Sequence, residues 1–175
     1  MFAFISDFFK GRPKEEAQPK LQSVSQSQSR AERTIKYDPT LIDTLKKDHS
    51  KLVTLYGSMW KEGFEKKDYR KLSNMIAEFK ASFQSHLLKE NVKFYVYLEQ
   101  SLAGDIHTLQ VVKDFRTDMN EIANAVIQFC KKYAHQAFTH EMEQDFERDY
   151  VKIGEVLTRR VSMEENELYL LYQPE

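Results

Sequence analysis

The sequence predicts an all-α protein, an antiparallel up-down-up-down four-helix bundle with a flexible N-terminal extension. The prolines are at positions 13, 19, 39 and 174, so none interrupts residues 40–173. In that region apolar residues recur at spacings of three and four, which is the period of an amphipathic helix. Breaks near residues 63–68, 102–105 and 134–140 leave four long segments with short connections, as in an antiparallel bundle.

Each of the four segments carries one apolar stripe. The first segment is predicted to begin at Asp38-Pro39, where aspartate can cap the helix and proline fits its first turn. Its stripe is Leu41, Leu45, Leu52, Leu55 and Met59. The second stripe is Leu72, Ile76, Phe79, Phe83, Phe94 and Leu98. The third is Val112, Met119, Ile122, Val126, Phe129 and Tyr133. The fourth is Phe146, Tyr150, Ile153, Leu157, Leu168 and Leu171.

Three regions are expected along the chain. Residues 1–10 form a short amphipathic segment rich in phenylalanine, and residues 11–36 form a polar linker with too few large apolar side chains to pack. The bundle itself is expected at residues 37–173. The segment at residues 1–10 suits docking on a membrane surface, on a partner protein or on the bundle, and the sequence leaves these open.

Composition narrows the function classes and the compartment. Lys and Arg total 26 against 27 for Asp and Glu, so no global field recruits nucleic acid, and no nucleic-acid partner is expected. The single cysteine, Cys130, fits a small buried apolar residue in a reducing compartment. No apolar run is long enough to cross a bilayer and no secretory leader is evident. A cytoplasmic protein is predicted, with peripheral attachment to an inner membrane through residues 1–10 left open.

Polar residues interrupt the stripes at comparable heights in the bundle. The predicted layer comprises His49, His86, Glu90, Arg116, Arg160 and Glu164. In two antiparallel helices, residues equally far from the connecting turn lie at the same level along the bundle axis. By this count Glu90, Arg116 and Arg160 lie at one level. His49 lies five to nine residues from the positions expected opposite His86 and Glu90, or about 8–14 Å along the helix. Inward charges cost several kcal/mol unless they are paired or bind a metal, so this layer predicts a site or its remnant.

Three segments resemble the signatures of the hemerythrin-like (HHE) family. They are LKKDHSKL at 45–52, HLLKENVKFY at 86–95 and LTRRVSMEENELY at 157–169, and the resemblance covers residues 38–172. It implies a bundle that holds two irons, or another divalent pair, and serves in oxygen binding, sensing or regulation.

Carried over residue by residue, the resemblance implies His49, His86, Glu90 and Glu164 as metal ligands, with Glu165 as an alternative to Glu164. The histidine expected on the fourth helix is replaced by Arg160, which does not bind metal, so one of the two metal positions is expected to be lost.

The ligand of the third helix is left open by the sequence. His107 has a family-like separation from His86 but does not share a face with Arg116, so it is a weaker candidate. His135 and His140 flank a turn and are expected in solvent.

A second resemblance is to the Rsd/AlgQ family of bacterial anti-sigma regulators. It depends on Gly154, Leu157, Arg160 and Glu164, with Leu41 to Asp43 on the first helix. It implies a helical bundle that binds a sigma factor and has a core of arginine–carboxylate pairs. It also accounts for the arginine at position 160.

Two hypotheses therefore remain from the sequence. In one, a regulatory or sensory bacterial module binds one iron, or Mn or Zn, at the four candidate ligands. In the other, Arg116 and Arg160 pair with Glu90 and Glu164 in a metal-free core, and the protein is a non-catalytic regulator that binds a protein partner such as a sigma factor. An enzyme is the less favoured alternative, because oxygen chemistry generally uses a second metal.

Overall fold

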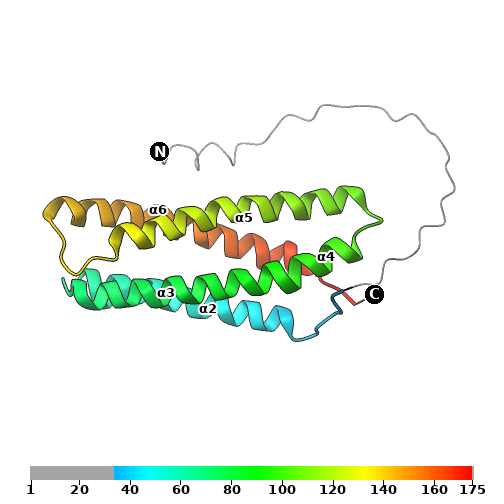
Figure 1. The fold of residues 1–175 in the computed structure, drawn as a ribbon, viewed down its shortest axis with the longest axis horizontal. Coiled ribbons are helices and arrows are strands. Elements are labelled where there is room, and N and C mark those ends of the chain that lie inside the picture. The colour runs from blue at the N-terminus through cyan, green and yellow to red at the C-terminus, as the bar shows by residue number, and fades with distance from the viewer. Residues whose placement is uncertain (1–33, 175) are drawn as a thin grey trace, which may run out of the picture. The chain divides into compact units, whose positions relative to one another are not determined.

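The computed structural model describes residues 34–174, and every described element is helical (Figure 1). The elements are α2 (Leu41–Ser58), the π-helix η1 (Met59–Phe64), α3 (Tyr69–Lys89), the π-helix η2 (Glu90–Tyr95), α4 (Val96–Ser101), α5 (Ile106–Tyr133), α6 (His140–Asn166) and the 3₁₀ turn η3 (Leu168–Leu171). The predicted amphipathic segment at 1–10 and most of the predicted linker at 11–36 lie outside the described residues.

Four helical rods run alternately up and down the long axis of the bundle (Figure 1). The first rod is α2 with η1, the second is α3 with η2 and α4, and α5 and α6 are the third and fourth. The predicted all-α four-helix bundle is confirmed, and the second and third connections lie where the sequence predicts them. Between residues 34 and 174 no helix has both the length and the apolar character needed to span a bilayer.

Side chains at the helix starts fix where three of the rods begin. Asp68, Asp105 and Thr139 each accept a hydrogen bond from a backbone N–H in the first turn, at 3.0, 3.1 and 3.2 Å. The first helix begins at Leu41, two residues later than predicted, because Asp38 and Pro39 form a turn ahead of it. Asp38 accepts from the Thr40 N–H at 2.9 Å within this turn, so it stabilises the approach to the helix, and the N-cap Thr40 makes no side-chain cap bond.

The interior contains two apolar clusters with a polar layer between them. One cluster lies toward the α2–α3 and α5–α6 connections and includes Phe79, Phe129 and Phe146. The other lies toward the α4–α5 connection and the C-terminus and includes Phe94 and Tyr169. Five of the six buried polar residues lie between the two clusters: His49, His86, Glu90, Arg160 and Glu164. The sixth, Asp149 on α6, accepts a hydrogen bond from Tyr133 within the first cluster.

The second rod changes from α- to π-helical hydrogen bonding within this polar layer. The change begins at Glu90, directly after α3 ends. A π-turn widens the helix by one residue, and Phe94 and Tyr95 within it are both buried. Phe94-Tyr95-Val96-Tyr97 has the aromatic and β-branched composition of a strand, but the segment continues the helical pattern of the second rod and is helical in the structure. The local π-helix was not predicted, and such segments occur often at functional sites.

A close helix contact at Gly63 gives a first testable prediction. A Cβ at this position would lie 2.8 Å from the Cβ of Leu72 and 2.9 Å from its Cα, so Gly63→Ala must push η1 and α3 apart. We expect a loss of about 1–3 kcal/mol in the free energy of unfolding, measured by urea denaturation. Gly57→Ala is the control: its Cβ meets nothing within 4 Å, and we expect a gain of about 0.5–1 kcal/mol. Equal effects of the two changes would contradict this packing.

Candidate metal centre

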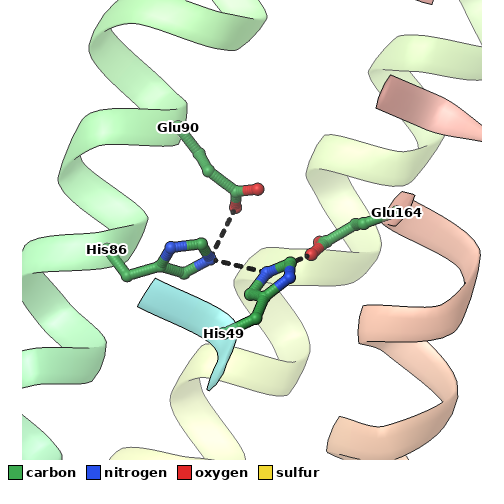
Figure 2. Close-up of side chains that lie close together, drawn as sticks. All are labelled: His49, His86, Glu90 and Glu164. Carbon is green, nitrogen blue, oxygen red and sulfur yellow. Dashed lines mark hydrogen bonds and ion pairs between the residues drawn. The ribbon is translucent and has the colours of Figure 1, made fainter. Parts of the chain in front are cut away.

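Four buried side chains from three rods converge in the polar layer (Figure 2). His49 comes from α2, His86 from α3, Glu90 from the first position of η2 and Glu164 from α6. Each is between 1% and 4% exposed. One ligand atom from each residue lies within 4.8 Å of the other three. These are the four ligand residues implied by the sequence, and the fold brings them together.

The separations between the ligand atoms are close to those around one transition-metal ion. The Nε2 atoms of His49 and His86 are 3.2 Å apart, His49 Nε2 lies 3.2 Å from Glu164 Oε2, and His86 Nε2 lies 3.7 Å from Glu90 Oε2. With metal–ligand bonds of about 2.1 Å, neighbouring ligands are about 3.0–3.4 Å apart and opposite ligands about 4.2 Å. The group therefore fits a single cation after an inward shift of a few tenths of an ångström.

Two buried atoms of this group lack a hydrogen-bond partner in the described part of the chain. They are Glu90 Oε2, which faces His86, and His86 Nδ1. A buried polar atom left unpaired costs about 1–3 kcal/mol, and more if it carries charge. Coordination of a cation by Glu90 Oε2 would remove this cost at the centre of the group.

The outer nitrogens of both histidines face carboxylates. His49 Nδ1 lies 2.7 Å from Glu165 Oε1, and His86 Nδ1 lies 3.6 Å from Asp48 Oδ2. Metal-binding histidines commonly donate their second N–H to a carboxylate, which fixes the ring and directs the other nitrogen at the metal. Glu165 is thus placed as the partner of a ligand rather than as the ligand. Asp48 is not among the predicted site residues, and although it precedes His49 in sequence its carboxylate faces His86 on the neighbouring rod.

This outer contact gives a second prediction. Glu165→Gln keeps the size of the side chain but removes the charge that orients His49, so we expect the affinity for a divalent cation to fall about 10- to 100-fold. Glu155→Gln, an exposed position on the same helix, is the control and should leave the affinity unchanged. Titration with Zn²⁺ against a competing chelator measures both. An unchanged affinity in Glu165→Gln would show that Glu165 does not support metal binding by His49.

Burial and charge set different proton affinities within the group. Burial and the neighbouring His49 lower the pKa of His86 to about 4, so His86 is neutral at pH 7 and has a free lone pair. Burial and the nearby Glu164 raise the pKa of Glu90 to about 8. Burial opposes charge on His49, but hydrogen bonds to Glu164 and Glu165 outweigh it and raise its pKa. Burial also opposes charge on Glu164, yet its contacts with His49 and Arg160 lower its pKa. Binding of a cation here would release protons.

Comparison with known proteins agrees with this geometry. The family model described as the hemerythrin HHE cation-binding domain matches residues 40–172. The chain belongs to this family. No curated protein and no solved structure matches it significantly. The match does not test the second resemblance, to the Rsd/AlgQ regulators.

The fourth helix carries a buried arginine in the polar layer. Arg160 is 5% exposed, and its Nε donates to Glu164 Oε1 at 2.5 Å while its Nη2 donates to the hydroxyl of Tyr95 at 2.8 Å. Its guanidinium carbon also lies 5.0 Å from the ring centroid of Phe115. The sequence predicts the pairing of Arg160 with Glu164, and this contact is present.

Two tyrosines complete the polar layer and were not predicted. Tyr95 receives the Arg160 hydrogen bond, and Tyr169 donates to Glu90 Oε1 at 2.8 Å while its ring stacks 5.8 Å from that of His49. Both hydroxyls are placed by irregular backbone, Tyr95 by η2 and Tyr169 by η3. Helical periodicity does not describe such segments, so neither contact can be predicted from the spacing of residues.

Arg116 does not join the buried group, and its predicted pairing with Glu90 is wrong. Its Nη1 donates to Glu99 Oε1 at 2.8 Å and its Nε donates to Asn91 Oδ1 at 3.2 Å, and its side chain is 33% exposed. Arg116 lies at the level of Asn91, next to Glu90, as predicted, but it is at the edge of the apolar stripe of α5. Its side chain therefore reaches the neighbouring rod near the surface.

The remaining histidines also lie away from the site. His107 is exposed at the second position of α5 and is not part of the four-residue group. His135 and His140 are exposed at the α5–α6 connection, where solvent was expected. Among the described residues, α5 thus contributes no histidine or carboxylate to the group.

The position of the first connection accounts for most of the predicted offset between His49 and His86 along the bundle axis. The connection occupies residues 65–68, so its centre lies after residue 65, about which the sequence-based count was made. The position expected opposite His86 is therefore about residue 47. The offset from His49 is then about 3 Å along the helix axis.

Proposed function

We propose that the protein binds one divalent transition-metal cation through His49, His86, Glu90 and Glu164, and that it acts as a regulatory or sensory HHE module rather than as an enzyme. The observation that carries this proposal is the convergence of four buried ligand atoms within 4.8 Å, with Glu90 Oε2 left unpaired at the centre. Such an arrangement is costly without a cation and favourable with one.

The donor set suits iron, manganese or zinc. Two imidazoles and two carboxylates are ligands that Fe(II), Mn(II) and Zn(II) all accept, and the choice depends on geometry and supply. When bound, the cation would supply a Lewis-acidic centre, and iron would also supply a redox centre. His49 and Glu164 hold the α2 and α6 sides of the site, while Tyr169 orients Glu90.

One cation is proposed, rather than the pair that other family members hold. The position of the histidine expected on the fourth helix carries the permanent charge of Arg160, which repels a nearby dication. A single metal lacks the partner that two-metal oxygen chemistry uses, and this supports a regulatory role over a catalytic one. Residues 37–173 would be the cation-binding module, residues 1–10 would dock on a protein partner or membrane, and residues 11–36 would link the two. The buried free Cys130 supports a reducing, cytoplasmic location.

Metal analysis of the full-length protein tests the proposal. We expect about one equivalent of iron, manganese or zinc per chain after purification without chelator. His86→Ala should lower the affinity for added Zn²⁺ more than 100-fold, because it removes a ligand and leaves a cavity beside Glu90. His140→Ala, which changes an exposed histidine, is the control. Two equivalents per chain would refute the single site, and none after reconstitution would favour the metal-free core.

The second candidate is a non-catalytic regulator of the anti-sigma type. The observation that favours it is the buried Arg160–Glu164 pair, which partly neutralises the polar layer without a metal. Under this proposal a sigma factor is retained by the purified protein, and alanine at His49 and His86 leaves that binding intact. Loss of partner binding in those variants would instead link the partner to the cation site.

A further inference from the structure

A cavity of about 310 Å³ lies against the candidate metal centre. Its walls come from α2, α3, α5 and α6 and include Phe79, Phe83, Met119 and Leu157. Val53 and Val151 also line it and are 63% and 51% exposed, so the cavity reaches the surface between α2 and α6. The metal-site function described above does not require a space of this size.

The cavity is large enough for a small organic molecule. An apolar protein cavity of about 150 Å³ accepts benzene, so one of twice that volume accepts about ten to twelve non-hydrogen atoms. Ordinary ligand pockets begin at about 300 Å³ and combine apolar walls with a few polar groups that orient the ligand. This cavity has that composition, since aromatic and aliphatic side chains form most of its surface.

Four residues of the polar layer line the cavity. They are His49, His86, Arg160 and Glu164, and Arg160 is the permanently charged member. Two of the three guanidinium nitrogens are used by Glu164 and Tyr95, whereas Nη1 has no hydrogen-bond partner among residues 34–174. The guanidinium therefore retains donor capacity beside an apolar space, and a planar carboxylate is the group that this donor geometry binds best.

We propose that the cavity binds a small apolar carboxylate of about ten to twelve non-hydrogen atoms. The hydrocarbon part lies among Phe79, Phe83 and Leu157, and the carboxylate faces Arg160. Binding depends on the cavity and on Arg160, so the inference goes beyond the proposed cation function and does not need it. A bound cation strengthens the interaction, because its positive charge offsets the negative charge of Glu90 and Glu164 near the bound carboxylate.

Octanoate is a suitable probe for the full-length protein. Isothermal titration is expected to show one octanoate per chain, bound at least tenfold more tightly than octylammonium and than butyrate. The first comparison tests the charge of the head group and the second tests the apolar walls. Failure of octanoate to bind, or equal binding of octylammonium, would overturn the proposal.

Variants of Leu157 locate the octanoate without disturbing the charged pair. Leu157→Trp fills the cavity and should weaken octanoate at least tenfold, while Leu157→Met keeps the volume and should bind normally. Both should keep the helical circular-dichroism spectrum of the wild type, which shows independently of any cation that they are folded. Undiminished binding to Leu157→Trp would place octanoate elsewhere and overturn the proposal.

Titration with and without Zn²⁺ separates this inference from the proposed function. Octanoate binding by a protein that takes up no metal would refute the cation site and support the cavity. Metal uptake without octanoate binding would support the cation site and refute the carboxylate cavity. Binding of both, with octanoate tighter in the loaded protein, is the expected result.

Discussion

Arg160→Met is expected to lower the free energy of unfolding of the metal-free protein by about 3–5 kcal/mol. Methionine preserves most of the volume but leaves Glu164 without its arginine, and Glu164 is only 2% exposed. The hydroxyl of Tyr95 loses its partner in the same change. Urea denaturation in the presence of a chelator measures the loss.

A cation should restore part of this stability. In the loaded protein Glu164 is neutralised by the metal, so the variant is expected to recover stability with Zn²⁺ to a greater extent than the wild type. Arg70→Met, which makes the same change at an exposed position of α3, is the control and should shift stability by no more than about 0.5 kcal/mol. A small loss in metal-free Arg160→Met would mean that Glu164 does not depend on the arginine.

The sequence predicted the bundle well because amphipathic periodicity and short connections are local features. The same periodicity put His49, His86, Glu90, Arg160 and Glu164 on buried stripes, and all five are buried. It failed at the edges of the stripes: Arg116 was expected inside, yet its long side chain reaches Glu99 at the surface. A spacing of three or four cannot distinguish the centre of a stripe from its margin.

The contacts made by the neighbours of the buried polar group could not be predicted from helical periodicity alone. Tyr95 is placed by a π-helical segment and Tyr169 by a 3₁₀ turn, and neither keeps the phase of an α-helix. Asp48 points across to His86 on the next rod, not to its neighbour in sequence, His49. Such pairings depend on how far two rods are rotated and offset, which is decided by the whole core.

The polar layer divides the core, and this division has an energetic consequence. Charged and imidazole groups replace apolar contacts across the middle of the bundle, so the two apolar clusters contribute most of the stability. A change deep within one cluster should therefore alter stability without altering the site. Phe146 is the best place to test this, because it is fully buried and lies 14 residues before Arg160, or about 21 Å along α6.

Phe146→Ala is expected to lower the free energy of unfolding by about 3–5 kcal/mol, while the affinity of the folded protein for Zn²⁺ stays within about twofold. The Phe146 ring centroid lies 4.5 Å from that of Phe64 and 5.0 Å from that of Tyr133, so alanine leaves a void that these rings cannot fill. Phe146→Leu retains most of the apolar volume and should cost less than half as much. Urea denaturation and Zn²⁺ titration are measured on the same samples. Loss of stability alone lowers the folded fraction but does not change the Zn²⁺ affinity of the molecules that remain folded. A loss of affinity in the folded protein would therefore show that the aromatic cluster positions the metal ligands.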